Sequence, residues 1–430
     1  MSPMPEIRGW CPTAWRPMES GDGLLIRAKM IGARIDAAQL SAIAYIAKTF
    51  GNGLIDLSQR AQLQIRGVQT AALKDALDAL NAAGLLAASA DVERITNILA
   101  PPIAGLDQSA AFDANRLLTD LAEALAQDAA LHTLPPKFLF AVVDGGALPI
   151  DASEADISFH PATGGRIALR LAGVEDAAVI VAHNVAVDVA LRLAKAFIRL
   201  RAANPFDLRR IRKLIPTAGV APLIEQAGVA LSPFSLTPSA VTAAYLGVQN
   251  LDDVVIAGVA APSGRWRAEE LAAVAEEAAA HGLNEARLTP WRAILFPAPN
   301  PTSAAKIIAR ATTMGLIVDI DDPRRSVVAC PGRPECSQAQ GETRRHLERL
   351  APLARQYAGE DGVGLHISGC GKGCARQTST PLTLVLDRGR FNLVFNGGAK
   401  EKPTQTGLTL DEVVQALTRN ARKKAPCLTN

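Results

Sequence analysis

The stretch IDAAQLSAIAYIAKTFGNGLIDLSQRAQLQI occupies residues 35–65, and WRAEELAAVAEEAAAHGLNEARLTPWRAILF at residues 266–296 aligns with it without a gap. The offset between the two copies is 231 residues. In the first copy, apolar residues at positions 40–47 follow helical spacing and Gly51 supplies a stop. The apolar positions then switch to a period of two, which is typical of a strand. The chain is therefore expected to contain a duplicated unit in which a helix precedes a strand.

An apolar run precedes each copy, at residues 24–28 and 254–259, and adds a strand before each helix. Two such strand–helix–strand half-modules are expected to pair by pseudo-twofold symmetry. Proline-rich joints near residues 101, 233 and 297 divide the remainder of the chain. The expected fold class is α+β, with two paired half-modules and two larger α+β modules.

The expected domains have the following bounds. A first half-module covers residues 1–75, and a first α+β module covers residues 76–235. A second half-module, which pairs with the first, covers residues 236–300. The final α+β module covers residues 301–430 and contains four cysteines in two close pairs.

Composition excludes several classes of protein. A formal net charge of +3 on 430 residues is too small to indicate a nucleic-acid-binding protein. The chain shows neither a signal-peptide pattern nor a run of eighteen apolar residues, so we expect a cytoplasmic protein with no membrane association. No G-x-G-x-x-G motif follows a strand, so no nicotinamide or flavin site is indicated and electrons should come from a partner.

The cysteine pairs carry the strongest chemical signal. The first pair is Cys330-Pro-Gly-Arg-Pro-Glu-Cys336 and the second is Cys370-Gly-Lys-Gly-Cys374. Structural zinc sites favour tighter spacing, usually two intervening residues, because both thiolates must meet one small tetrahedral ion. A cubane cluster is larger and accepts wider loops. The spacing favours a 4Fe-4S cluster over a zinc ion or four unligated thiols.

The other candidate metal ligands form no pattern. Cys11 and Cys427 are isolated in sequence and are expected to be ordinary thiols. The six histidines show no metal-ligand spacing, so the sequence does not select the two histidines and carboxylate that a mononuclear iron centre would use.

The cysteine loops resemble those of the sulfite and nitrite reductase superfamily, which have the same C-x5-C and C-x3-C spacings. The resemblance covers nearly the whole chain. It includes four further stretches: GDGLLIR at 21–27, LSQR at 57–60, AGLD at 104–107 and LPPKF at 134–138. Three others are similar to the precorrin-3B synthase family: GWCP at 9–12, RPM at 16–18 and LTPWR at 288–292. The resemblance implies ferredoxin-like half-modules in a duplicated reductase-like architecture.

The resemblance also implies a reaction. It indicates an iron-sulfur-dependent monooxygenase of aerobic cobalamin biosynthesis, which uses O2 to hydroxylate precorrin-3A at C20 with formation of a γ-lactone. The implied partners are this tetrapyrrole, O2 and an external electron donor, either an NADH-linked reductase or a ferredoxin. Besides the cluster, it allows a mononuclear non-heme iron. The alternatives are a siroheme-dependent sulfite or nitrite reductase and a non-catalytic iron-sulfur binding protein.

Departures from the reductase pattern disfavour siroheme chemistry. Arg27 and Lys137 match two cations that reductases place around their small anion. Leu139 and Thr96 stand where two further cations are expected, although Arg94 lies only two residues from Thr96. Loss of two positive charges would weaken binding of a small oxyanion by kilocalories rather than tenths.

Arginines near the first strand are candidates for substrate binding. On an expected strand over residues 57–66, alternation places Arg60 and Arg66 on one polar face. In the second copy, the positions that align with Arg27, Arg60 and Arg66 hold the uncharged residues Gly258, Trp291 and Pro297. Because a single site needs such asymmetry, we expect Arg27, Arg60, Arg66 and Lys137 to bind substrate carboxylates; the alternative is a solvated or ion-paired face. The sequence identifies no catalytic residue.

Overall fold

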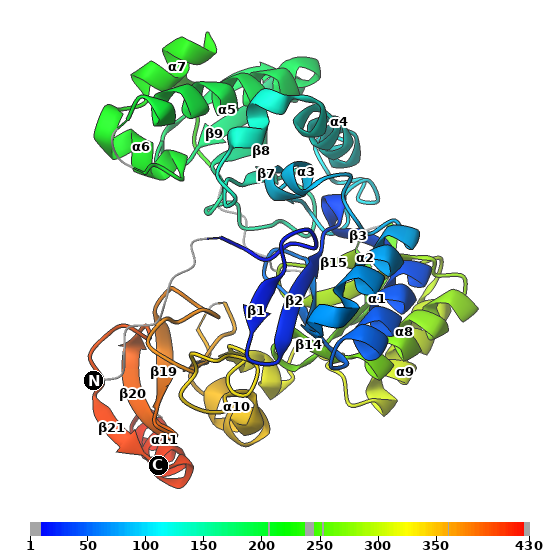
Figure 1. Ribbon diagram of the computed structural model, residues 1–430, viewed down its shortest axis with the longest axis vertical. Coiled ribbons are helices and arrows are strands. Elements are labelled where there is room, and N and C mark those ends of the chain that lie inside the picture. The colour runs from blue at the N-terminus through cyan, green and yellow to red at the C-terminus, as the bar shows by residue number, and fades with distance from the viewer. Residues whose placement is uncertain (1–9, 205–206, 237–244, 252, 360, 425–430) are drawn as a thin grey trace, which may run out of the picture.

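Two half-modules, a helical α+β module and a C-terminal module make up the molecule (Figure 1). The computed structural model describes residues 10–204, 207–236, 245–251, 253–359 and 361–424. The half-modules lie on the right of the view in Figure 1, the second module above them and the C-terminal module at the lower left. The predicted fold class, α+β with paired half-modules and two larger modules, is confirmed.

The two half-modules exchange their edge strands. The first sheet runs β1 (Met18–Ser20), β2 (Gly23–Ala28), β5 (Leu63–Val68), β4 (Leu54–Leu57) and β14 (Arg265–Arg267). The second half-module's sheet runs β12 (Gly247–Leu251), β13 (Val254–Ala260), β16 (Ala293–Ala298), β15 (Glu285–Leu288) and β3 (Arg34–Asp36). Each sheet is therefore completed by a strand from the other copy. The predicted domain bounds remain predictions, and no single cut separates these halves.

Two related helices cover the paired sheets. Helix α1 (Ala37–Phe50) begins at Asp36, whose carboxylate accepts the N–H of Gln39 at 2.7 Å while the Gln39 side chain accepts the N–H of Asp36. It packs against α8 (Ala268–Ala280), with α2 (Leu73–Ala82) and α9 (Pro301–Thr313) on either side. One apolar core, including Leu40 and Leu271, runs through both halves. Its continuity fixes the halves relative to each other.

The expected continuous strand at residues 57–66 is wrong, because a turn interrupts it. Strand β4 ends at Leu57 and β5 begins at Leu63. Between them the N–H of Ala61 donates to the carbonyl of Ser58 at 3.0 Å, and Ala61 adopts a positive φ of 50°. The reversal places Arg60 in the turn and Arg66 within β5. The period-two pattern crossed a hairpin, so these two arginines do not share a strand face.

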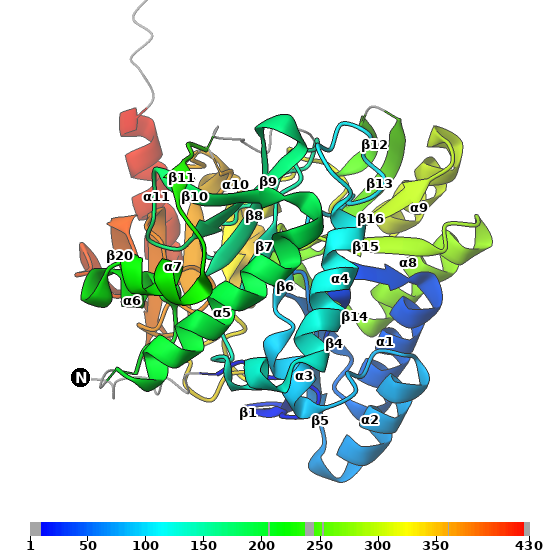
Figure 2. The same cartoon turned by 90° about the horizontal axis from the view of Figure 1, so that it is seen from above.

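The second module is a mixed sheet covered by helices. Its strands run β11 (Ser232–Pro233), β10 (Ala177–Ala182), β9 (Arg166–Leu171), β8 (Ile157–Ala162), β7 (Phe140–Val142) and β6 (Ile98–Leu99). Its helices are α3 (Ala90–Ile95), α4 (Ala114–Gln127), α5 (Ala186–Ala202), α6 (Ile211–Ala218) and α7 (Ala221–Ala227). Helices α4 and α5 pack together over the module's core (Figure 2).

The C-terminal module carries the clustered cysteines. Its sheet runs β17 (Val327–Ala329), β18 (Leu365–Ser368), β19 (Thr380–Asp387), β20 (Arg390–Gly397) and β21 (Gln405–Leu408), with helices α10 (Leu347–Arg355) and α11 (Leu410–Lys424). Helix α10 begins only at Leu347, since the backbone of residues 340 and 341 bonds to Gly369 and Arg333 in the cysteine loops. No helix in the described ranges is long and apolar enough to cross a bilayer.

Candidate functional site

The four clustered cysteines lie at one edge of the C-terminal sheet. Cys330 directly follows β17, while Cys370 and Cys374 follow β18, the parallel neighbour of β17. Because parallel neighbours end at the same edge, both loops leave the sheet together. The N–H of Gly369 donates to Cys330 Sγ at 3.1 Å, and the N–H of Cys336 donates to the carbonyl of Gly332 at 2.7 Å.

Two glycines allow the cysteine loops to approach this closely. A Cβ at Gly369 would lie 2.8 Å from the Cβ of Ala339 and 3.3 Å from Cys330 Sγ. Gly332 has a φ of +73°, and a Cβ there would meet Thr343 Oγ1 at 2.5 Å. A larger residue at Gly369 would push the loop of Cys370 away from that of Cys330, and one at Gly332 would collide with Thr343, which follows the first cysteine pair.

The thiols interact electrostatically as a group. Burial raises the pKa of the buried Cys330 thiol; the N–H groups of Gly369 and Gly332 oppose the rise, and the Cys336 and Cys370 thiols add to it. Among the described residues, no three His, Cys, Asp or Glu side chains converge closely enough for one metal ion. The residues in these loops that could hold a cofactor are the four cysteines, and a cluster's iron charge would offset four thiolates. Cys427 lies outside the described residues.

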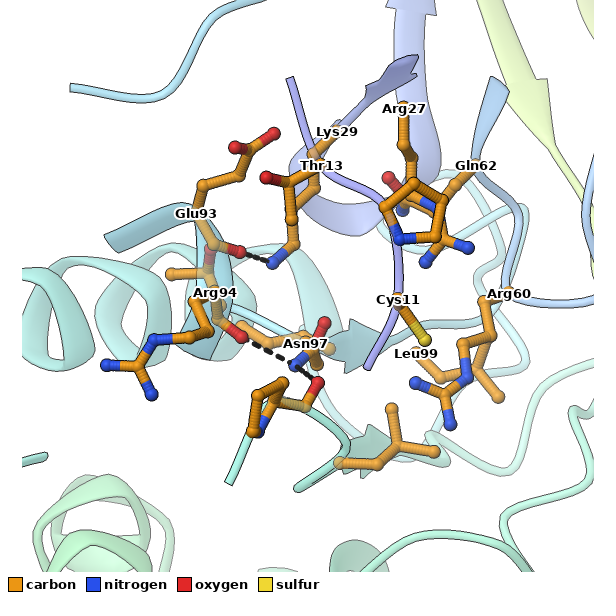
Figure 3. Close-up of a pocket in the computed structure, with 15 residues that line it drawn as sticks. Cys11, Thr13, Arg27, Lys29, Arg60, Gln62, Glu93, Arg94, Asn97 and Leu99 are labelled. Carbon is orange, nitrogen blue, oxygen red and sulfur yellow. Dashed lines mark hydrogen bonds between the residues drawn. The ribbon is translucent and has the colours of Figure 1, made fainter. Parts of the chain in front are cut away.

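A pocket of about 30 Å³ lies between the first half-module and the second module. Figure 3 shows Arg27, Cys11 and Arg60 gathered on one side of it and Lys29 with Glu93 on the other. Burial lowers the pKa of Arg27, a shift that the nearby Cys11 thiol opposes and Arg60 increases. Arg60 Nη1 is buried and has no hydrogen-bond partner among the described residues. Two predicted substrate-binding arginines therefore meet in one polar pocket.

Lys29 is a functional candidate that the sequence analysis missed. Burial lowers its pKa to about 7, with Glu93 opposing the shift and Arg27 and Arg60 adding to it. Its Nζ donates to the backbone carbonyl of Glu93. The sequence contained a sign of this. Lys29 follows Arg27 by two residues, directly after the end of β2, so alternation places both side chains on the same face of the strand. A lysine that titrates near neutrality can hold or release a proton in this pocket.

Glu93 also fastens the N-terminal segment across the pocket. Its buried carboxylate accepts the N–H of Ala14 at 2.8 Å and the N–H of Trp15 at 3.0 Å. Cys11 and Thr13, which precede these residues, line the pocket. The segment was expected to matter only through its resemblance to a family, and the structure makes it a wall of the pocket.

The uncharged departures from the reductase pattern lie in the same pocket. Thr96 and Leu139 both line it, and the Thr96 hydroxyl donates to the carbonyl of Val92 at 2.8 Å. Arg94 also lines the pocket, but its guanidinium points away (Figure 3) and donates to the carbonyl of Leu134 at 2.8 Å. Arg94 therefore does not replace the missing charge. Lys137 lies next in the chain to the lining residue Pro136.

Arg66 lies elsewhere, in a buried ion-pair network. Its guanidinium pairs with Asp22 at 3.0 Å and Asp56 at 3.3 Å, and it donates to the carbonyl of Glu335 at 3.0 Å. Only 2% of Arg66 is exposed. The structure thus does not bring Arg66 together with Arg27 and Arg60. Arg66 instead joins the first sheet to the loop that carries Cys336.

Asp56 is the centre of that network. Its carboxylate also accepts from Arg265 of β14 at 2.9 Å and from Arg344 of the C-terminal module at 2.8 Å. Burial alone would raise the pKa of Asp56, but Arg344, Arg265 and Arg66 outweigh burial and hold the pKa well below its usual range. Arg265 also pairs with Glu335. Three parts of the chain therefore meet on one carboxylate.

Comparison with known proteins gives a consistent result. The nitrite/sulfite reductase ferredoxin-like half domain matches residues 16–83 and again residues 249–313. A precorrin-3B synthase from a Sinorhizobium species is 29% identical, covering 92% of this chain and 84% of its own length. A ferredoxin–nitrite reductase from Synechococcus elongatus is 24% identical, covering 87% of this chain and 78% of its own. The structure of the Mycobacterium tuberculosis NirA protein has a TM-score of 0.75 at 22% identity, over 93% and 80% of the chains.

Proposed function

Because the nitrite/sulfite reductase ferredoxin-like half domain matches the chain twice, and a precorrin-3B synthase is 29% identical over 92% of it, we propose that this oxidoreductase is a monooxygenase of precorrin-3A. In the proposed reaction one atom of O2 enters the macrocycle at C20 and a ring acetate closes a γ-lactone. The other oxygen atom leaves as water, using two electrons from a donor and two protons. An NADH-linked reductase or a ferredoxin would supply the electrons, and the reaction would take place in the cytoplasm.

The composition of the small pocket carries this proposal. Arg60 has an Nη1 without a hydrogen-bond partner among the described residues, and the guanidinium of Arg27, whose Nη2 lies 2.7 Å from the Gln64 side-chain amide, lines the same pocket. Guanidinium groups suit the carboxylates of a precorrin. Thr96 and Leu139 line the same pocket without adding charge. Such a pocket is poorly matched to a small, multiply charged oxyanion such as sulfite, and better matched to one carboxylate arm of a large ring.

The four cysteines, Cys330, Cys336, Cys370 and Cys374, would hold a 4Fe-4S cluster. When bound, the cluster supplies one-electron transfer. The chain's own contribution is the N–H of Gly369, which donates to Cys330 Sγ at 3.1 Å and would stabilise negative charge on that sulfur. Glycine at this position also keeps the two loops close enough to share one cluster.

Residues of the small pocket would position the substrate and manage one proton. Arg27 and Arg60 would bind a carboxylate, and the segment held by Glu93 would restrict water. Lys29, with its pKa of about 7, would be protonated and unprotonated in similar amounts near neutrality. It is the residue in this pocket best placed to donate a proton at working pH.

A siroheme-dependent sulfite or nitrite reductase is the second candidate. The likeness to a ferredoxin–nitrite reductase over 87% of this chain supports it, as does the retained Arg27. Siroheme remains disfavoured because the pocket lacks two of the expected cations. A cluster-binding protein without activity would make Arg27 and Arg60 dispensable.

Labelled dioxygen tests the proposal. Protein purified without air is first analysed for iron, sulfide and tetrapyrrole, then mixed with precorrin-3A, a reductant and labelled O2. A product one oxygen heavier that carries the label is the expected result. Arg27→Ala should lower the rate, while Arg116→Ala, at an exposed site on α4, should not. Formation of sulfide or ammonia from sulfite or nitrite, without oxidation of the macrocycle, would overturn the proposal.

A further inference from the structure

A second and larger cavity, of about 250 Å³, lies where the second half-module meets the C-terminal module. The 231-residue offset relates it to the small pocket, since Lys29 and Arg60 line that pocket while their counterparts Ala260 and Trp291 line this one. The duplicated scaffold therefore forms a pocket at the same place in each copy. The sequence comparison had indicated that the cations belong to the first copy alone.

Four arginines nevertheless line the second cavity: Arg292, Arg324, Arg325 and Arg376. Only two of them have acidic partners at ion-pair distance among the described residues. Arg324 pairs with Asp322 and, at 3.9 Å, with Glu348, while Arg376 pairs with Asp361 at 2.6 Å. The cavity therefore retains excess positive charge in a partly enclosed space.

Arg292 is held in place without a carboxylate partner among the described residues. Its guanidinium makes a long contact, 3.5 Å from Nη1 to the carbonyl of Ser263. Burial lowers its pKa to about 10, with Arg344 adding to the shift and Asp56 opposing it. An arginine that stays charged at neutral pH in such surroundings gains free energy from an anion.

The backbone around Arg292 is arranged to present this side chain. Arg292 has a positive φ of 64°, as does its counterpart Ala61 with 50°. A Cβ at Gly264 would lie 2.7 Å from Arg292 Cδ, so the arginine stem passes over a glycine that leaves room for it. The first copy places alanine at this turn and the second places a cation. This substitution within a shared conformation moves a positive charge to the second cavity.

Besides Arg292, the cavity is lined by arginines of the C-terminal module and by two stacked aromatic rings. Arg325 Nη2 donates to Tyr245 Oη at 2.9 Å, and its guanidinium lies 5.5 Å from the centre of the Tyr245 ring. The Tyr245 ring stacks on Trp291, with centroids 4.8 Å apart. Arg376 Nε is buried without a hydrogen-bond partner among the described residues. Donors on two modules therefore border one space.

We propose that this cavity binds a compact organic polyanion with at least two carboxylate or phosphate groups, which bridges Arg292 of the second half-module to Arg325 and Arg376 of the C-terminal module. Guanidinium groups bind both kinds of anion through paired hydrogen bonds. The volume is below the roughly 300–1,000 Å³ of pockets for drug-sized ligands, which excludes a whole tetrapyrrole. The site is separate from the small pocket and does not depend on the reaction proposed there.

Calorimetric titration tests the site with two probes, citrate for carboxylates and pyrophosphate for phosphates. Chloride keeps the ionic strength constant. We expect saturable binding of at least one probe, weakened roughly ten- to a hundred-fold by Arg292→Gln. Arg116→Gln, on the exposed surface, should leave this binding unchanged. Tighter citrate binding identifies a carboxylate ligand, and tighter pyrophosphate binding a phosphate ligand.

A second variant distinguishes loss of binding from loss of folding. Arg376→Gln changes the other module and should weaken the same binding event, provided that its circular dichroism matches the parent protein. The bound probe should also raise the melting temperature of the parent protein more than that of either variant. Absence of saturable binding, or equal affinity in the parent and both folded variants, would overturn the proposal.

Discussion

Replacement of Asp56 by asparagine should destabilise the joint between the modules. The substitution keeps the size of the side chain but removes the negative charge that three guanidiniums share at 2.8–3.3 Å. Removing one partner of a buried ion pair typically costs about 3–5 kcal/mol, because the remaining charge stays buried without compensation. Asp22 and Glu335 still neutralise part of the charge, so we expect about 3 kcal/mol rather than the upper limit.

The pH dependence gives this prediction a second test. The folded-state pKa of Asp56 lies well below its ordinary value of 3.8, so its carboxylate stabilises the fold above that pH. The stabilisation is lost as the pH falls below about 4 toward the folded-state pKa. The Asp56→Asn variant lacks the stabilisation by the ionised carboxylate. Its free energy of unfolding should therefore fall less steeply between pH 4 and pH 2.5 than that of the parent protein.

Urea unfolding followed by circular dichroism measures both effects, and limited proteolysis locates them. Cleavage of the variant should increase within residues 333–345, where Glu335 and Arg344 contact the first sheet. Asp78→Asn is a matched control, since Asp78 pairs with Lys74 on the exposed surface of α2. If Asp56→Asn were as stable as this control and kept the parent's pH dependence, the carboxylate could not be the joint that its contacts indicate.

Three further predictions concern the two candidate sites. If the four clustered cysteines hold one shared cluster, as proposed, each of them changed singly to serine should abolish bound iron and sulfide together; two variants with intact cluster spectra would contradict the ligand assignment. Arg27→Ala and Arg60→Ala should each weaken binding of a polycarboxylate tetrapyrrole roughly ten- to a hundred-fold at unchanged iron content, as measured by fluorescence quenching; unchanged affinity in both would make them structural. Anion binding at the small pocket should weaken as the pH rises through about 7, where Lys29 loses its proton, and Lys29→Met should remove that inflection; the same inflection in the variant would assign it to another group.

The duplication and the cysteine loops could be predicted from the sequence because each leaves a direct pattern. The two copies align without a gap, and the spacing from Cys330 to Cys336 differs from that of zinc sites. The parallel pairing of β17 and β18, which brings the two loops to one edge, is not visible in any local pattern. It depends on contacts between residues about forty positions apart, such as Val328 and His366.

The arginine assignments show where periodicity is insufficient. Alternation from Arg60 to Arg66 predicted one face, but the turn at Ala61 reverses the chain and sends Arg66 toward Asp22 and Asp56. The sequence places Lys29 two residues after Arg27, but the burial and charged neighbours that lower its pKa are known only from the structure. Arg292 was overlooked because comparison at equal offsets examined positions that are charged in the first copy, where its counterpart is alanine.

The exchanged edge strands affect how the chain can be made. The first sheet lacks its edge until β14 pairs with β4, yet residues 265–267 are synthesised about 210 residues after Leu57. At about 5–20 residues per second, the ribosome takes about 10–40 s to supply them. Throughout that interval the nascent first half presents the backbone of Leu54–Leu57 as an unpaired edge, which invites association with neighbouring chains. Completion of both sheets is thus a late event of biosynthesis, and the interval before it is the period in which a chaperone has most to protect.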